Sequence, residues 1–441
     1  MAGEIKGRNF SLFWMWLIIM ISTFNFNAYG ADWKKVEEDY QAKKAKAIAK
    51  GPPDCYVVRT GNKLIIFDSR PELGIGVHEF DQEVIDNLKK ANIRFIRTTM
   101  YWYNVENTTE KGKYNQAELE KWDKRIDLLQ KNKIIPLIVV HGNAPGCSFA
   151  NRVESYNRFA DFMKFIVNRY KYIRYWELWN EMDVAFTDLF GAGVNGDLIP
   201  VKERGKYYAE MLKLVYPAIK EANPEAIVLT GGSASGTTDF QEGIYEGGGK
   251  DYFDIMGIHT YGVPLQWSFV LTGIKLQEAM KKHGDGTKPI WNTEFGIDAG
   301  NFVAAWGLPE GDQGEYFDRL QKEEIAECIE FNLKAGLFQK ILPYQYVAGN
   351  ERWVDALKEV RLPAGMTIDD YGFGFMRKDG KTPRPVFQYI IDTNPNGRAG
   401  LEAERTVTIP LILDNGKVKK IKVNQCNVIC RIVQRSNFNF A

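Results

Sequence analysis

The chain has 441 residues, of which 45% are hydrophobic and 26% are charged, and its formal net charge is +1. This composition is typical of a folded globular protein, and near-neutrality gives no reason to expect nucleic acid or an anionic membrane surface as a partner. The length exceeds that of an average domain but suits a barrel of alternating strands and helices built as one unit.

The first 30 residues have the pattern of an export signal. Lys6 and Arg8 precede an apolar run over residues 12–21, which is shorter than the roughly 20 apolar residues that a membrane span requires. Ala28 and Gly30 then offer small residues before a cleavage site. We expect residues 1–30 to be a signal peptide and the mature protein to be secreted or periplasmic, without stable membrane insertion. The alternative is an uncleaved N-terminal anchor.

Residues 31–70 form a separate N-terminal segment. Residues 31–50 are rich in Lys, Glu and Ala and predict an exposed helix, which Gly51, Pro52 and Pro53 end. Two apolar runs, 56–60 and 64–67, flank a Gly-Asn pair. That pattern predicts a β-hairpin.

From residue 71 to residue 396 short apolar runs alternate with amphipathic stretches. We predict eight strands, at 74–78, 95–100, 134–141, 175–180, 227–231, 255–260, 289–294 and 341–346. We predict helices at 82–91, 116–131, 153–169, 202–222, 274–283 and 313–335, a weaker one near Phe240, and a last one from Pro385. This alternation favours an α/β fold in the form of a closed (β/α)₈ TIM barrel. An open doubly wound sheet is the rival, but no G-x-G-x-x-G follows the first strand.

The tail, residues 397–441, has a different character. A hairpin around residues 414–416 and a further strand at 428–433 are expected. We expect these strands to join the N-terminal hairpin in a small accessory β-sheet beside the barrel. The five cysteines do not form a disulfide framework or a zinc-binding spacing, although one bridge from Cys55 to Cys426 or Cys430 stays open.

Polar side chains gather where the predicted barrel strands end. Active sites of such barrels lie at the C-terminal ends of the strands, whereas barrel packing favours branched aliphatic residues. Arg97 and Glu177 are expected to form a buried ion pair. Tyr261 lies two residues after His259, so that both side chains point to one side. The polar residues at or near strand ends are His78, Arg97, His141, Asn180, Glu181, His259, Tyr261, Asn292 and Glu294.

Two of these strand ends share a pattern. Residues 176–181 read Trp-Glu-Leu-Trp-Asn-Glu, and residues 291–296 read Trp-Asn-Thr-Glu-Phe-Gly. Each is an apolar strand with a Trp-Asn pair and a glutamate at its exit. Two glutamates at the ends of separate strands are the pair of carboxylates that cleavage of a glycosidic bond requires.

The run Tyr-Trp-Glu-Leu-Trp-Asn-Glu at 175–181 resembles the fourth-strand motif of the clan of retaining (β/α)₈ glycoside hydrolases. It is most similar to glycoside hydrolase family 39 and its exopolysaccharide-cleaving relatives, and next to the family 5 cellulase-like group. The resemblance implies that Glu181 is the acid/base and Glu294 the nucleophile. It also implies that Asn180 contacts the sugar 2-hydroxyl, and it matches His259, Tyr261 and Arg97 to the clan's strand-end residues.

The motif departs from the clan's pattern in two places. Met182 and Asp183 replace the proline that usually follows the acid/base, and the eighth strand lacks the tryptophan that often lies under the reacting sugar. Tyr344, Tyr346 or Trp353 is expected to substitute for that tryptophan. Other aromatic residues that follow strand ends are candidates for a sugar-binding cleft: Tyr101, Trp102, Tyr103, Trp267 and Trp306.

We therefore expect a glycosidase that cleaves β-linked bonds of an oligo- or polysaccharide by a two-glutamate double displacement, with no cofactor and no metal. The substrate-binding residues are expected to be His78, Arg97, Tyr101, Trp102, His141, Asn180, His259, Tyr261, Asn292, Tyr344 and Trp353. The rivals are a non-catalytic carbohydrate-binding barrel and a metal-dependent barrel hydrolase. A serine hydrolase is disfavoured because residues 231–236 do not match G-x-S-x-G.

Overall fold

A computed structural model describes residues 33–60, 63–184, 188–191, 199–299, 302, 313–347, 372–398, 405–413, 418–425, 430–434 and 438–439. The expected signal peptide, Trp306 and Trp353 lie outside these residues. Within them, no helix combines the length and the apolar character that crossing a membrane requires.

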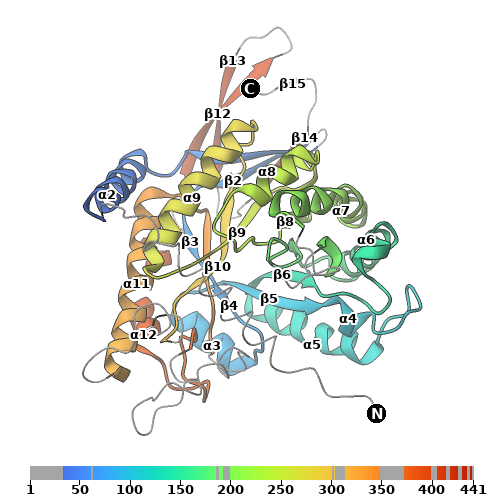
Figure 1. The fold of residues 1–441 in the computed structure, drawn as a ribbon, viewed down its shortest axis with the longest axis horizontal. Coiled ribbons are helices and arrows are strands. Elements are labelled where there is room, and N and C mark those ends of the chain that lie inside the picture. Colours follow the sequence, from blue (N-terminus) through green and yellow to red (C-terminus); the bar gives the residue numbers. More distant parts are fainter. Residues whose placement is uncertain are drawn as a thin grey trace.

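Eight parallel strand positions form the barrel (Figure 1). One sheet has the order β4-β5-β6-β7-β8 and the other β3-β11-β10-β9. The first barrel strand is split into β3 and β4, which pair with β11 and β5 respectively. On the opposite side, bridges Leu229–Ile255 and Ser233–Ile258 join β8 to β9. The two sheets therefore make one ring, as the alternating sequence predicts. The strands are β3 (Glu72–Leu73), β4 (Ile75–Gly76), β5 (Phe95–Tyr101), β6 (Ile135–His141), β7 (Tyr175–Leu178), β8 (Ile227–Thr230), β9 (Met256–Tyr261), β10 (Ile290–Gly296) and β11 (Lys340–Pro343).

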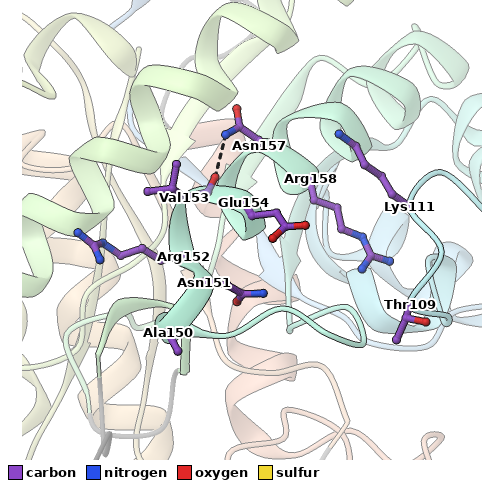
Figure 2. A pocket seen from close by; sticks show the side chains of 9 residues that line it. All are labelled: Thr109, Lys111, Ala150, Asn151, Arg152, Val153, Glu154, Asn157 and Arg158. Carbon is purple, nitrogen blue, oxygen red and sulfur yellow. Dashed lines mark hydrogen bonds between the residues drawn. The ribbon is translucent and has the colours of Figure 1, made fainter.

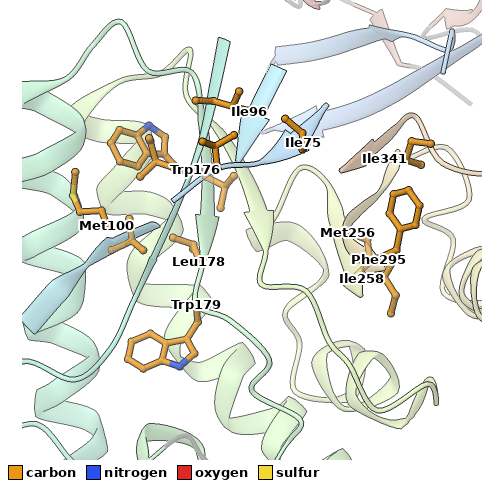
Figure 3. Packing of buried hydrophobic residues seen from close by; sticks show 14 of the residues in the cluster. Ile75, Ile96, Met100, Trp176, Leu178, Trp179, Met256, Ile258, Phe295 and Ile341 are labelled. Carbon is orange, nitrogen blue, oxygen red and sulfur yellow. The ribbon is translucent and has the colours of Figure 1, made fainter. Parts of the chain in front are cut away.

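Helices surround this ring (Figure 1). They are α3 (Gln82–Lys90), α4 (Trp102–Val105), α5 (Gln116–Asn132), α6 (Arg152–Arg169), α7 (Val201–Ala222), α8 (Asp239–Glu246), α9 (Leu265–Lys282), α11 (Gln313–Ala335), α12 (Pro385–Thr393) and α13 (Pro395–Arg398), with 3₁₀ turns η2 (Phe149–Asn151), η3 (Asp188–Phe190) and η5 (Lys250–Tyr252). Outward-facing strand residues such as Ile96, Met100, Trp176 and Phe295 fill the layer between strands and helices (Figure 3).

Helix α9 begins nine residues before its predicted start at Ile274, and the prediction was wrong there. Its first half contains β-branched and aromatic residues and Gly273, all of which lower helix propensity. Packing overrides this preference. A Cβ atom on Gly273 would lie 2.5 Å from the Phe338 ring, so the glycine permits the close approach that holds the helix against the barrel.

Inside the ring, a second apolar cluster closes the bottom of the barrel. It takes side chains from the barrel strands, including Phe95, Tyr175 and Trp291. The hairpin β1 (Cys55–Thr60) and β2 (Lys63–Asp68) adds four residues from below: Tyr56, Val58, Ile65 and Phe67. The main chain of Val57 also exchanges hydrogen bonds with Thr287. The N-terminal hairpin is therefore a lid on the N-terminal end of the barrel, opposite the strand ends where chemistry is expected.

The predicted accessory sheet exists, but it contains fewer C-terminal strands than expected. Strand β14 (Cys430–Gln434) pairs with β2, which gives the order β1-β2-β14. The C-terminal hairpin of β12 (Arg405–Leu413) and β13 (Val418–Gln425) does not join it and pairs instead with β15 (Phe438–Asn439). Cys55 is a free cysteine, so the possible bridge to the tail is not formed. N-terminal helix α2 (Trp33–Lys50) packs on α9 and α11.

Candidate active site

Three polar residues lie in the barrel interior directly above the apolar bottom layer. Because side chains of a strand alternate between faces, Arg97 follows Phe95, Glu177 follows Tyr175 and Thr293 follows Trp291 on the inner face. Glu177 and Thr293 are fully buried and Arg97 is 5% exposed. Arg97 Nε donates to Glu177 Oε2 over 2.6 Å, and the Thr293 hydroxyl donates to Glu177 Oε1 over 2.9 Å. The expected buried ion pair of Arg97 and Glu177 is present.

Glu294 enters the barrel because β10 is irregular. Simple alternation would place Thr293 and Glu294 on opposite faces. The register of β10 shifts between Asn292 and Glu294 against β9, and between Asn292 and Phe295 against β11. Such a bulge re-aims side chains, and bulges are frequent next to active sites. Glu294 consequently points inward, where Arg97 Nη1 donates to one carboxylate oxygen and the Tyr261 hydroxyl donates to the other over 2.6 Å.

Glu181 stands on a constrained turn after β7. Trp179 has φ +74° and Glu181 has φ +52°, both in the left-handed region that bulky residues rarely adopt. The Glu181 N–H donates to the carbonyl of Gly232, and the Asn180 side chain accepts from Arg97 Nη2 over 2.7 Å. Neighbouring hydrogen bonds thus hold a strained exit that presents Asn180 and Glu181 at the rim.

The Gly231–Gly232 pair makes room for this turn. A Cβ atom on Gly231 would lie 2.6 Å from the Trp179 carbonyl oxygen, and one on Gly232 would lie 2.1 Å from the His259 ring. Asp183, buried behind Glu181, accepts from the N–H groups of Ala234 and Ser235. The close fit of residues 231–232 against the Glu181 turn and His259 had no signal in the sequence beyond the run of small residues at 231–236.

His259 lies between the two glutamates. Its Nδ1 is 2.8 Å from Glu181 Oε1 and 3.6 Å from Glu294 Oε2, and one side-chain oxygen or nitrogen from each of the three residues lies within 4.8 Å of the other two. His259 and Tyr261 do point to the same side, as the spacing predicts. The two glutamates thus face each other across one imidazole nitrogen.

The two carboxyl groups differ in protonation. Burial alone would raise the pKa of Glu294, but the nearby His259 ring, the Arg97 charge and the Tyr261 hydrogen bond hold that pKa down to about 2. Burial raises the pKa of Glu181, against the opposing effect of its close contact with His259. One carboxyl group is therefore kept ionised, and the other retains its proton to a higher pH than an ordinary glutamate does.

His78 and His141 line the mouth of the barrel as neutral groups. Burial, followed by the nearby Arg97 charge, lowers the pKa of His141 to about 3. His78 is more exposed, and partial loss of hydration lowers its pKa as well. His141 packs edge-on against Tyr101, and His78 packs edge-on against Tyr344. Phe373, which no sequence pattern singled out, lies between Tyr344 and Tyr261.

Several predicted substrate contacts are corrected by the structure. Trp102 is fully buried against Phe159 in the layer behind the barrel. Asn292 points to the outer face of the sheet and contacts the Thr260 hydroxyl over 2.7 Å. Trp267 stacks on Tyr40 of α2. These three side chains stabilise the fold and do not reach the mouth. Tyr101 stacks on Tyr103, whose ring is 42% exposed.

Glu181, His259 and Glu294 are also the one group with metal-ligand spacing in the described part of the chain. Their surroundings oppose a cation, because the Arg97 guanidinium already donates to Glu294 and the Tyr261 hydroxyl occupies its second oxygen. We derive no chemistry through a metal.

A separate cavity of about 610 Å³ lies beside the first turns of α6 (Figure 2). Its polar groups are already engaged: Arg158 donates to Glu106 and to the carbonyls of Thr108 and Pro145, and Asn157 donates to the Val153 carbonyl. None of the predicted site residues lines it.

Fold and site together define a (β/α)₈-barrel hydrolase with paired glutamates at the strand ends. A family model described as Cellulase (glycosyl hydrolase family 5) matches residues 68–334. The chain belongs to glycosyl hydrolase family 5 and is an O-glycoside hydrolase. The clan predicted from the strand-end motifs is confirmed.

Solved structures with the same fold come from related families. A family 39 glycoside hydrolase from the gut symbiont Bacteroides cellulosilyticus WH2 has a TM-score of 0.55 at 20% identity, covering 82% of this chain and 71% of that one. A GH39 enzyme from Xanthomonas axonopodis pv. citri has a TM-score of 0.53 at 15% identity, covering 82% of this chain and 69% of that one. A monomeric beta-xylosidase from Caulobacter crescentus CB15 has a TM-score of 0.51 at 16% identity, covering 82% of this chain and 71% of that one. These identities show the fold alone. No curated protein matches the chain by sequence.

Proposed function

We propose that the protein cleaves β-linked O-glycosidic bonds of an oligo- or polysaccharide with retention of configuration, using Glu294 as nucleophile and Glu181 as acid/base. The observation that supports this most is the separation of the two glutamates. Oxygens of Glu181 and Glu294 lie within 4.8 Å of each other. Retaining enzymes hold their carboxyl groups about 5–5.5 Å apart, whereas inverting enzymes leave roughly 6.5–9.5 Å for a water molecule.

The reaction takes two displacements. In the first, an oxygen of ionised Glu294 bonds to the anomeric carbon, the bond to the leaving oxygen breaks, and protonated Glu181 gives its proton to that oxygen. In the second, water attacks the same carbon, Glu181 takes the water proton, and the Glu294 ester bond breaks. The opposite pKa directions of the two carboxyl groups support these roles.

Two substitutions test the roles separately. Glu294→Ala is expected to lower kcat by at least about 10⁴-fold, because the covalent step is lost; substantial residual hydrolysis would refute its role as nucleophile.

Glu181→Ala is expected to lower kcat. Added azide is expected to restore the rate and to give a β-glycosyl azide as product, since a small anion needs no general base. A Glu181→Ala enzyme with wild-type rates would refute the acid/base role. Glu242→Ala is the matched control, because Glu242 is a half-buried glutamate that contacts His283 outside the site.

We infer that the Tyr101–Tyr103 pair is a stacking surface for a further sugar unit. The rings are 5.2 Å apart, and a Cβ atom on Gly142 would lie 2.6 Å from the Tyr103 ring, so the glycine admits it. Aromatic faces favour apolar contact with flat ligands. Tyr103→Ala is expected to raise KM for oligosaccharides and to leave KM for an aryl monosaccharide unchanged. An equal effect on both substrates would contradict this assignment.

We also propose that residues 1–30 direct export and are removed. The basic start, the short apolar run and the small residues before position 31 support this. N-terminal sequencing of the protein recovered from the producing cell tests it. A mature chain that begins near residue 31 is expected, and one that retains residues 1–30 would favour the anchored alternative.

A further inference from the structure

The carboxylate of Glu177 takes part in neither displacement, yet it is completely buried inside the site. Its Oε2 accepts from Arg97 Nε, and its Oε1 accepts from the Gly232 N–H over 3.0 Å and from the Thr293 hydroxyl over 2.9 Å. These contacts hold it in a fixed position. Neither substrate nor solvent reaches it.

One nitrogen of His259 faces this carboxylate. His259 Nε2 is 4.0 Å from Glu177 Oε1. It is buried and makes no hydrogen bond with any described residue. The other nitrogen, Nδ1, lies 2.8 Å from Glu181 Oε1. The imidazole ring therefore connects the buried carboxylate to the acid/base.

A neutral imidazole carries one proton, and its location depends on the neighbours of each nitrogen. A lone pair on Nε2 would face the negative Glu177 oxygen, whereas an N–H on Nε2 would be attracted to it. We propose that Glu177 is a positioning residue that keeps a proton on Nε2 of His259, which leaves the Nδ1 lone pair to accept a hydrogen bond from protonated Glu181. The inference rests on the proposed role of Glu181 as acid/base.

The opposite tautomer would harm the reaction. With its proton on Nδ1, His259 would donate to the Glu181 carboxylate, stabilise the ionised form and lower the pKa of the acid. With the proton on Nε2, a protonated Glu181 donates to Nδ1. Glu177 thereby favours the state in which Glu181 can protonate the leaving group.

The charges around the ring agree with this arrangement. Glu177 and Glu181 face it from the fourth strand position, Glu294 from the seventh and Arg97 from the second, and Tyr261 lies two residues along its own strand. Three carboxyl groups are thus balanced by one guanidinium, so a proton on the Glu181–His259 pair is needed. Consistently, burial raises the pKa of Glu181. Burial lowers the pKa of His259, but the Glu294 and Glu181 charges raise it overall.

The pH dependence of kcat/KM in the Glu177→Gln variant tests the proposal. Glutamine keeps the shape but removes the charge that holds the Nε2 proton. The basic limb of kcat/KM, which reports Glu181, is expected to move to lower pH by about one unit or more. Asp254→Asn is the matched control, because Asp254 is also fully buried and accepts from Tyr216 and Lys220 away from the site. It is expected to lower stability and leave the limb in place. An unmoved limb in Glu177→Gln would overturn the proposal.

A second measurement is made on the wild-type protein and does not depend on catalytic activity or on the folding of Glu177→Gln. The chain has only 4 histidines, so the ring nitrogens of the wild-type protein can be resolved by ¹⁵N NMR and His259 identified by comparison with single histidine variants. Nε2 is expected to carry a proton across the active pH range. A neutral ring with its proton on Nδ1 would refute the inference even if the enzyme is a retaining glycosidase. A protonated Nε2 in a protein without activity would instead refute the proposed function alone.

Discussion

Gly232 fixes the position of His259 more directly than any hydrogen bond does. Gly232→Ala would place a methyl group 2.1 Å from the ring, so the imidazole has to move away from Glu181. Overpacking of this kind costs about 1–3 kcal/mol of stability, and a displaced catalytic group costs roughly 10²-fold in rate. We expect kcat to fall at least that much while the protein stays folded, measured by kinetics and circular dichroism.

Gly76→Ala is the control for that experiment. A Cβ atom there meets its nearest neighbour at 3.5 Å, an ordinary contact, so activity is expected to change little. If Gly232→Ala retained wild-type kcat, the tight fit between residues 231–232 and His259 would have no part in the reaction.

The pH dependence of kcat/KM follows from the two carboxyl groups. The proposed mechanism requires ionised Glu294 and protonated Glu181. Because the pKa of Glu294 is held at about 2 and burial raises that of Glu181, we expect the basic limb above the ordinary glutamate value of about 4.3 and the acid limb well below it. An acid limb at the ordinary value together with full activity at alkaline pH would contradict the assignment. The depressed pKa of Glu294 also contributes stability that is present above its unfolded value and is lost as pH falls toward 2.

At the scale of elements, period-two alternation explains most of the site. It places Arg97, Glu177 and Thr293 above the aromatic residues that precede them by two positions, and it is readable from the sequence. The bulge that turns Glu294 inward is not, because it depends on how β10 meets both neighbouring strands. The bulge does not explain the misassignment of Asn292, because alternation from the inward-facing Trp291 already directs residue 292 outward. Its side chain faces the outer layer, although its motif resembles that around Asn180.

The accessory hairpin β1–β2 shows how an element far from the site supports it. Phe67 is fully buried in the cluster at the barrel bottom. Phe67→Ala is expected to lower the free energy of unfolding by about 3–5 kcal/mol and to leave KM unchanged, because the strand ends are at the opposite side. Chemical denaturation and steady-state kinetics measure both. The exposed Leu214→Ala is the control, expected within about 0.5 kcal/mol. A stability loss no larger than that of Leu214→Ala would contradict the lid assignment.

Across the whole molecule, the sequence predicted the barrel because each strand is a short apolar run between amphipathic helices. The eight predicted strand positions agree with the observed ones to within a few residues at their ends. Partner choice among the C-terminal strands was not predictable. Three strands with free edges can pair in several ways, and the hairpin β12–β13 pairs with β15 while β14 alone reaches β2. Such long-range pairing is decided by three-dimensional proximity, which local patterns do not contain.

The order of the ring brings together four distant segments: residue 97, residues 177–181, residues 259–261 and residue 294. They converge around one imidazole and bring three carboxyl groups, two of them buried, into one site with one guanidinium. This arrangement also ties the proposed chemistry to the spacing of two of those groups, which a single experiment can address.

That experiment is ¹H NMR of the first product released from a β-linked substrate, chosen from a panel of xylan, glucan, mannan and exopolysaccharide fragments. Double displacement through Glu294 predicts that the β anomer appears first and then equilibrates to the α form. An initial α anomer would mean inversion by a single displacement and would contradict the central claim that Glu294 forms a covalent bond to the sugar.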